Sequence, residues 1–307
     1  MTKNISVSEE AVVTTSKLKS VLTDLKYLLK GIVLWANVLP VLAGFWLAIY
    51  FTGSSFKDYW EVLLLTMAGS TFVVAGALVL NNWYEVDLDK KMKRTQKRPT
   101  VTGTFSMKQV FMLGISFTVI GFILLAFTTF EAWIYGLVGW VTYVLLYTMW
   151  MKRRYTLNTV MGSISGAMTP LIGWAAVTSS YHYVPIVLAL LLFIWQMPHT
   201  FAIAIRRHDE YKAAGVAMLP VVRGIEFTKR QMIVYIAALL PLPFFLPSFG
   251  IWFLVIMTIL NVVWLLLAIG GFFTNSDKKW ARAQFLYSVN YLAILFVVMI
   301  ISTLPNQ

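Results

Sequence analysis

Oxygen-bearing side chains recur at every fourth position where one long apolar stretch ends. They are Asn81, Glu85 and Asp89, and on a helix they share one face, spread over about 12 Å along its axis. Asp87 points away from that face if the helix is regular. Mg²⁺ accepts one or two carboxylates, keeps water ligands and takes phosphate oxygens for its other positions. The spacing therefore predicts a magnesium site at Asn81, Glu85 and Asp89 that can receive a phosphate group.

Basic residues follow these acids directly, and three of them are placed to hold the outer phosphates. Lys91 offers a point charge, and Arg94 and Arg98 offer bidentate forks. The alternative is an ordinary interfacial loop, in which acids and bases pair in water for about 1 kcal/mol or less per pair. We favour the phosphate site because the acids are clustered at helical spacing rather than scattered.

A second polar segment follows another apolar stretch. His199 lies inside that stretch, and an ionisable residue within a membrane is a candidate for function. The alternative is a histidine that hydrogen-bonds across helices. Asp209, Tyr211 and Lys212 come next, and Ala213 stands where a second carboxylate would complete a helical pair with Asp209. We therefore do not expect a second metal ion held by two carboxylates.

The composition indicates which solvent surrounds these segments. Of the 307 residues, 59% are hydrophobic and 12% are charged, whereas a soluble domain carries about 25% charged residues. A transmembrane helix needs roughly 20 mostly apolar residues, and the chain supplies many such runs. The absence of cysteine excludes disulfides, thiolate metal sites and cysteine nucleophiles. The sequence therefore predicts an all-α, polytopic membrane protein.

We expect nine transmembrane helices around a central cavity. The predicted spans are 29–51, 60–83, 109–130, 132–151, 158–178, 184–205, 231–248, 250–273 and 281–303. Glu131 marks the boundary between the third and fourth spans, and the turn Pro247–Gly250 separates the seventh from the eighth. Residues 1–28 form a predicted cytoplasmic tail without the apolar core of a cleaved signal, and residues 29–307 form one membrane-embedded domain.

Lysine and arginine fall almost entirely on one side of this arrangement. With the N-terminus inside, 24 of the 25 lie in the tail or in loops that follow even-numbered spans, and Lys57 alone lies outside. Cytoplasmic loops carry this excess in membrane proteins. We therefore expect a cell-membrane protein whose tail and polar loops are cytoplasmic. The formal net charge of +12 then follows from topology, so we expect no nucleic-acid partner.

The first polar segment resembles the N-x-x-x-D-x-x-x-D motif of the intramembrane aromatic prenyltransferase superfamily, with Glu85 in place of the first Asp. Arg94-Thr95-x-x-Arg98-Pro99 and Val101-Thr102-Gly103 continue the resemblance. It implies that residues 29–307 form a prenyltransferase domain that uses Mg²⁺ and an isoprenyl diphosphate. The implied metal ligands are Asn81, Glu85, Asp89 and Asp209, which with Tyr211 are also the implied catalytic residues, and the implied diphosphate ligands are Lys91, Arg94, Arg98 and Lys212.

Other features resemble the branch of that superfamily that farnesylates haem. They are Pro198-His199, the run Asp209-x-Tyr211-x-x-x-Gly215-x-x-Met218, and Gly162, Gly166, Pro170 and Gly173 in the fifth span. Close helix approach is the alternative for the small residues. The resemblance implies that haem B and farnesyl diphosphate are the substrates. A haem vinyl group attacks the allylic cation left by diphosphate, and water captures the second cation to give haem O.

The resemblance also suggests how haem and the cation are held. His199 is a candidate axial haem ligand, and the candidates for contact with the propionates are Arg153, Arg154, Arg206 and Arg207. Anchoring by positive charge at the inner face is the alternative for each arginine. Candidates for cation–π stabilisation are Trp83, Tyr84, Tyr143 and Tyr147, with packing or interface anchoring as the alternative. A downstream haem-modifying enzyme is an expected partner.

Two other functions stay open. A prenyltransferase for a quinone precursor belongs to the same superfamily. A secondary transporter belongs to a different class, and transporters bind their substrates near the middle of the membrane. In this sequence the charged residues gather at one face, which favours an interfacial enzyme.

Overall fold

The computed structural model describes residues 23–304, and every regular element in that range is a helix. The long helices are α2 (Gly31–Thr52), α3 (Trp60–Tyr84), α6 (Met107–Ala126), α7 (Phe130–Val141) with its continuation η2 (Thr142–Met151), α8 (Asn158–Ala175), α9 (Tyr183–Arg206), α12 (Ile225–Leu239), α13 (Gly250–Ile269) and α14 (Asp277–Ser302). The predicted tail 1–28 lies outside the described residues, apart from residues 23–28.

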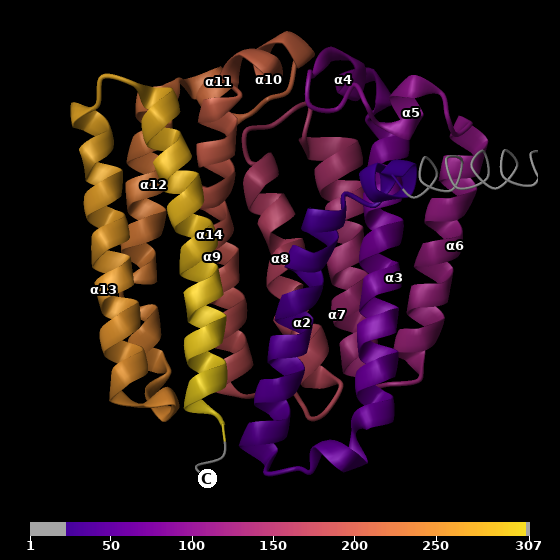
Figure 1. Ribbon diagram of the computed structural model, residues 1–307, viewed down its shortest axis with the longest axis vertical. Helices are drawn as coiled ribbons and strands as arrows, with labels where there is room; N and C mark the ends of the chain where they lie inside the picture. Colours follow the sequence, from indigo (N-terminus) through magenta and orange to yellow (C-terminus); the bar gives the residue numbers. More distant parts are fainter. Residues whose placement is uncertain (1–22, 305–307) are drawn as a thin grey trace, which may run out of the picture.

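The long helices stand side by side, and four short helices gather at one end of the bundle (Figure 1). The short helices are α4 (Val86–Lys91), α5 (Pro99–Thr102), α10 (His208–Ala214) and α11 (Leu219–Arg223). They belong to the two long loops that were predicted to carry the polar chemistry. The fold thus brings both polar segments to the same end of the molecule.

Seven of the long helices in the described range, counting α7 with η2 as one, are long and apolar enough to cross a membrane. α8 and α12 occupy the places of the fifth and seventh predicted spans, so each predicted span corresponds to a helix of the described chain. The seventh differs most, because α12 ends at Leu239 where a span to 248 was predicted. Prolines follow in the short turns η3 (Leu242–Phe245) and η4 (Pro247–Phe249), and proline cannot continue an α-helix.

The close packing of α2 on α8 depends on small residues. A Cβ atom added at Gly173 would lie 1.9 Å from the carbonyl oxygen of Val41, and one added at Gly44 would lie 2.1 Å from that of Pro170. Backbones approach this closely in membranes only where side chains are absent or small. Gly173 therefore has the packing role that was the alternative to a functional one, and the backbone of Pro170 lies against Gly44.

The other half of the bundle is held by buried indoles that donate hydrogen bonds between helices. Trp195 of α9 donates to the carbonyl oxygen of Ser288 in α14 at 2.8 Å. Trp264 of α13 donates to the Gln284 side chain of α14, also at 2.8 Å. Buried polar groups are costly unless they are paired, so these contacts fix α9 and α13 against α14. α9 carries His199 into this half.

Candidate active site

The first polar segment keeps its helical register across a break between two helices. Glu85 lies between α3 and α4, yet its amide donates to the carbonyl oxygen of Asn81 at 3.0 Å, and the amide of Asp89 donates to that of Glu85 at 2.9 Å. Asn81, Glu85 and Asp89 therefore share one face, and each is at most 3% exposed. Asp87 lies off that face, with 54% of its side chain exposed.

Each of these three residues meets a basic side chain. The ammonium of Lys30 donates to Oδ1 of Asn81. The ammonium of Lys152 donates to both carboxylate oxygens of Glu85 at 2.6 Å. The guanidinium of Arg98 donates to Oδ2 of Asp89. The result is a cluster of three basic side chains around an amide and two buried carboxylates, which we call the acid–base cluster (Lys30, Asn81, Glu85, Asp89, Arg98 and Lys152).

Lys152 reaches Glu85 because η2 is wound as a π-helix. The amide of Lys152 donates to the carbonyl oxygen of Tyr147, five residues earlier, at 2.9 Å. The wider winding turns Thr148 toward α3, where its hydroxyl accepts a hydrogen bond from the Asn81 amide at 3.0 Å. π-Helical turns are rare and occur frequently at functional sites. In the sequence Lys152 counted only as an inner-loop charge, and no pattern there indicates this winding.

Lys30 is the second residue that the sequence did not identify. It has φ 47° and ψ 53°, and it is the one non-glycine residue with positive φ in the described chain. Strained backbone of this kind clusters at functional sites. The side-chain amide of Asn82 donates to the carbonyl oxygen of Leu28 and holds this segment against α3. In the sequence, the only indication of a role for Lys30 was its position at the start of the first predicted span.

Electrostatics keep the Glu85–Lys152 pair ionised. Burial alone would raise the pKa of Glu85, but the charges of Lys152 and Lys30 outweigh it and hold that pKa below its usual range. Burial would likewise lower the pKa of Lys152, but the Glu85 carboxylate raises it above its usual range. Each group thus favours the charged form of the other.

Two tyrosines border the acid–base cluster. The ring of Tyr147 lies 5.4 Å from the ammonium of Lys152, and the rings of Tyr143 and Tyr147 lie 5.6 Å apart. Tyr84 instead lies under the guanidinium of Arg153 at 5.2 Å, and Trp83 packs against Phe111. Of the four predicted aromatic candidates, Tyr143 and Tyr147 are therefore the ones placed beside the cluster.

The second polar segment contributes less. Tyr211 is 7% exposed and packs with Leu88 and Met92 of the first segment. The side chain of Asp209 is 75% exposed and accepts hydrogen bonds from Lys278 at 3.0 Å and His208 at 3.2 Å. The hydrogen bond from Lys278 lowers the pKa of Asp209. Predicted diphosphate ligands outside the cluster, namely Lys91, Arg94 and Lys212, are exposed.

The predicted haem-binding residues are spread over this end of the molecule. Nδ1 of His199 lies 2.8 Å from the Ser288 hydroxyl, and its ring stacks on Trp195 at 4.7 Å. This is the cross-helix hydrogen bond that was the alternative reading, and it occupies one ring nitrogen. Arg206 lies over the ring of Phe285 at 5.1 Å.

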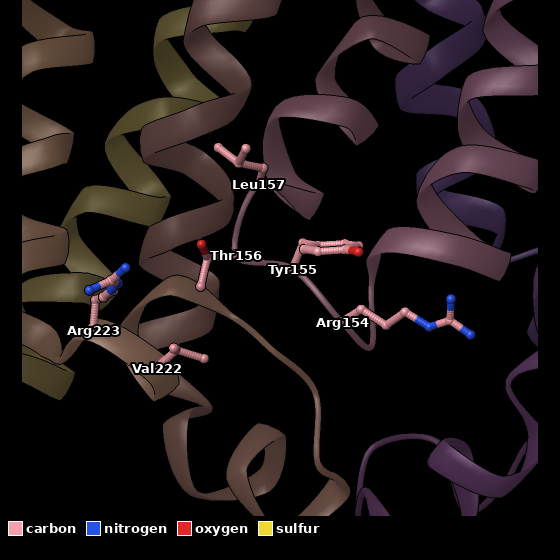
Figure 2. Close-up of a pocket in the computed structure, with 6 residues that line it drawn as sticks. All are labelled: Arg154, Tyr155, Thr156, Leu157, Val222 and Arg223. Carbon is pink, nitrogen blue, oxygen red and sulfur yellow. The ribbon is translucent and has the colours of Figure 1, made fainter.

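The remaining arginines differ in their partners. Arg153 donates to both oxygens of Asp87 at 2.7 and 2.8 Å, and Arg207 donates to Glu210 at 2.8 Å. Arg154 lines an open hollow at this end of the molecule (Figure 2). Arg153 and Arg207 are therefore engaged by carboxylates, whereas Arg154 has none within ion-pair distance in the described chain.

The acid–base cluster suits Mg²⁺ by its donor chemistry. It offers an amide oxygen and two carboxylates from successive helical turns, and Mg²⁺ takes such oxygens together with phosphate oxygens. No group of three or more His, Cys, Asp or Glu residues in the described range could hold a metal ion, so these oxygens are a partial ligand set. The cations that now face them are of the type that binds phosphate.

Comparison with known proteins places the chain among prenyltransferases. The family model described as the UbiA prenyltransferase family matches residues 37–289. Protoheme IX farnesyltransferase of Oceanobacillus iheyensis is 53% identical over 306 residues, which cover 99% of this chain and 98% of the relative. The protein of the same name from Geobacillus thermodenitrificans is 53% identical over 269 residues, 88% of each chain.

Solved structures show the same fold at low sequence identity. A digeranylgeranylglyceryl phosphate synthase matches 92% of this chain and 98% of its own, with a TM-score of 0.73 and 17% identity. A UbiA homologue from Archaeoglobus fulgidus, bound to DMAPP and Mg²⁺, matches 91% of this chain and 99% of its own, with a TM-score of 0.67 and 18% identity. The all-α membrane fold predicted from the sequence is confirmed.

Proposed function

The chain belongs to the UbiA prenyltransferase family, and from its likeness to relatives in that family we propose that it farnesylates haem. It transfers the farnesyl group of farnesyl diphosphate to a vinyl group of haem B with addition of water, giving haem O and diphosphate. The observation that carries this proposal is identity of about one half, over nearly the whole length, with relatives named protoheme IX farnesyltransferase. The acid–base cluster supports it by supplying a charged, buried place for a diphosphate.

The diphosphate lies on the acid–base cluster in this proposal. Lys30, Arg98 and Lys152 turn from the Asn81, Glu85 and Asp89 side chains to the phosphate oxygens. Lys91, Arg94 and Lys212 hold the outer phosphate from the rim. Mg²⁺, when bound to the freed oxygens, supplies further positive charge against the leaving group. Asp209 is held by Lys278 in this structure, so the proposal puts the metal on the first segment.

The chemistry begins with heterolysis of the bond between farnesyl C1 and the diphosphate oxygen. The electron pair leaves with diphosphate, and fixed positive groups aimed at that developing charge lower the barrier. The faces of Tyr143 and Tyr147 stabilise the allylic cation that is left. A haem vinyl group donates its π electrons to that cation. Water then adds to the new cation, and loss of a proton leaves the hydroxyl group.

Haem binds near the end of α9 that carries the polar residues. His199 uses its free ring nitrogen as an axial ligand while Ser288 orients the ring, an arrangement common among metal-binding histidines. Arg206 and Arg207 face the propionates. The enzyme is a multi-pass protein of the cell membrane with its N-terminus and polar loops in the cytoplasm. The product then passes to a downstream haem-modifying enzyme.

Incubation of the purified protein with haem B, farnesyl diphosphate and Mg²⁺, followed by mass analysis of the haem, tests this function. We expect a haem whose mass has increased by one farnesyl group and one water. Chelation of Mg²⁺ should abolish the product, and its return should restore it. An unchanged haem, together with prenylation of an aromatic acid under the same conditions, would instead identify a prenyltransferase for a quinone precursor.

A further inference from the structure

An open hollow of about 330 Å³ lies at the polar end of the molecule, between the segment that follows η2 and the short helix α11 (Figure 2). Its lining residues are Arg154, Tyr155, Thr156, Leu157, Val222 and Arg223. In Figure 2 the two arginines lie on opposite sides of it, and the side chain of Arg154 extends away from Arg223. The acid–base cluster does not include any of these residues, so the hollow is a separate feature.

The charge of the hollow is uncompensated. Arg154 and Arg223 are both exposed, and neither has a carboxylate within ion-pair distance in the described part of the chain. The adjacent Arg153 shows the contrast, because both of its terminal nitrogens bind Asp87. A guanidinium offers several donors in a plane that suits phosphate or carboxylate oxygens. The hollow is therefore suited to an anion.

The rim of the hollow is apolar and uncovered. Tyr155 is 47% exposed, Leu157 is 61% exposed and Val222 is 54% exposed. Exposure of apolar side chains of this size to water costs free energy, and contact with lipid hydrocarbon removes that cost. Two guanidiniums beside three exposed apolar side chains match an amphiphile with an anionic head and apolar chains.

A buried side chain joins the two walls of the hollow. Asn158 is 0% exposed. Its amide donates to the carbonyl oxygen of Ala217 at 3.0 Å and to that of Lys152 at 3.4 Å. Ala217 lies just before α11 and Lys152 lies at the start of the opposite wall. The width of the hollow is thus set by a fixed contact within the protein.

We propose that this hollow binds the headgroup of an anionic phospholipid from the leaflet at this end of the bundle. Arg223 holds the phosphate, Arg154 turns toward it from the opposite wall, and the acyl chains lie on Leu157 and Val222. A lipid is favoured because exposed apolar residues adjoin the arginines at one end of a bundle of membrane-spanning helices, and because basic pockets between such helices bind lipid headgroups. Arg154, predicted to meet a haem propionate, takes this role instead.

A bound lipid also affects the acid–base cluster, because one short stretch of chain links the two. Lys152 holds Glu85 at one end of this stretch, and Arg154 lines the hollow two residues later. A bound headgroup restrains the stretch and thereby the Lys152 ammonium. This consequence rests on the proposed function of the acid–base cluster, whereas lipid binding itself does not.

Native mass spectrometry of the purified full-length protein tests the proposal. The protein is released from bilayers that contain dioleoyl phosphatidylglycerol and dioleoyl phosphatidylcholine in equal amounts. The test variant is Arg154→Gln/Arg223→Gln. The matched control is Arg230→Gln/Arg282→Gln, which removes the same charge from exposed arginines outside the hollow. Elution volume and melting temperature verify that both variants are folded.

We expect the wild type and the control to retain phosphatidylglycerol in preference to phosphatidylcholine. The test variant should lose that preference by roughly thirtyfold, because it loses two direct guanidinium–phosphate contacts of about 1 kcal/mol each, whereas the control loses none. Equal losses in the two variants would overturn the proposal, since the attraction would then be diffuse.

A second arm separates lipid from haem. Haem B is added to the wild type with phosphatidylglycerol bound, and we expect the lipid to be retained. Stoichiometric displacement of the lipid by haem, together with weaker haem binding by the test variant, would assign the hollow to the propionates and overturn the lipid proposal. Neither arm measures turnover, so a failure of the proposed farnesyl transfer would leave both results interpretable.

Discussion

In the loop after α3, the carboxylates of Glu85 and Asp89 are buried against Lys152 and Arg98. In the loop after α9, the carboxylate of Asp209 is exposed and meets Lys278 at the surface. Both loops lie at the same end of the bundle, and both were predicted to hold the metal. The first loop buries its charges, whereas the second leaves them in water.

That difference indicates where the function lies. Removing charges from water is expensive, and a buried ion pair often contributes no more to stability than apolar residues of similar volume. An exposed pair contributes about 1 kcal/mol or less. The burial of two carboxylates against basic side chains is therefore poorly explained by stability and well explained by preorganised charge for a substrate.

The largest expected effect comes from leaving one partner of a buried pair alone. Lys152→Met removes the only cation that holds both oxygens of Glu85 in the described chain. We expect the free energy of unfolding to fall by about 3–5 kcal/mol, because a buried carboxylate loses its direct ion-pair partner. Thermal unfolding in detergent, followed by intrinsic fluorescence, measures this change.

The matched control is Glu85→Gln/Lys152→Met, which removes both charges. It should recover most of the lost stability, because the buried charge is gone. Equal destabilisation of the single and double variants would mean that Lys152 acts by packing rather than by charge. Buried charge would then not distinguish the first loop from the second.

The next effect is on turnover, and it compares the same substitution in the two loops. Asp89→Asn should reduce farnesyl transfer by about 10²–10³-fold, because it removes a carboxylate proposed to hold Mg²⁺ and the charged partner that positions Arg98, and both cations act on the leaving diphosphate. Asp209→Asn, in the exposed position, should reduce it by less than about tenfold, since it alters a surface contact. Product formation by folded variants, measured at saturating Mg²⁺, gives both values. Equal losses would place Asp209 on the metal after all.

The sequence predicted the fold and the first segment well for a physical reason. Runs of about 20 apolar residues and one-sided charge leave few arrangements open in a bilayer. Hydrogen bonds at four-residue spacing then put Asn81, Glu85 and Asp89 on one face, as the spacing predicted. These features are local or depend on composition, so they can be read along the chain.

The partners of these residues could not be read in that way. Lys30 and Lys152 lie 51 and 67 residues from the side chains that they contact. Lys152 depends on the π-helical winding of η2, and Lys30 on a left-handed backbone. The sequence also gave no sign that Asp209 would be exposed, because its helix α10 is positioned by packing of Tyr211 on the first segment.

The dependence of stability on pH sharpens the comparison further. The folded-state pKa of Glu85 is below its usual value. Its ionised form therefore adds stability at pH values above the unfolded pKa of about 4.3, and this stability is lost as the pH falls through the folded pKa. The pKa values of Asp87 and Asp209 are also lowered, so these groups change stability in the same direction, but both side chains are exposed. We expect the melting temperature of the wild type to fall on acidification below about pH 4.

The variant Glu85→Gln/Lys152→Met isolates the part due to the buried pair. It keeps Asp87 and Asp209 but lacks the carboxylate with the buried partner. Its melting temperature should fall less than that of the wild type over the same range, and the two curves should agree in shape above about pH 5. If the melting temperatures of the two proteins fell equally at acidic pH, exposed carboxylates rather than Glu85 would control stability in acid.

The smallest effect is expected at Asp87, which lies in the first loop but outside its buried face. Arg153 binds both of its oxygens, and 54% of its side chain is exposed. Asp87→Asn should lower the free energy of unfolding by about 1 kcal/mol or less, and high salt should remove most of that difference because it screens exposed pairs. Melting temperatures at low and high salt measure both values. A loss as large as that of Lys152→Met would show that membership of the first loop, rather than burial, decides the energetic role of its acids.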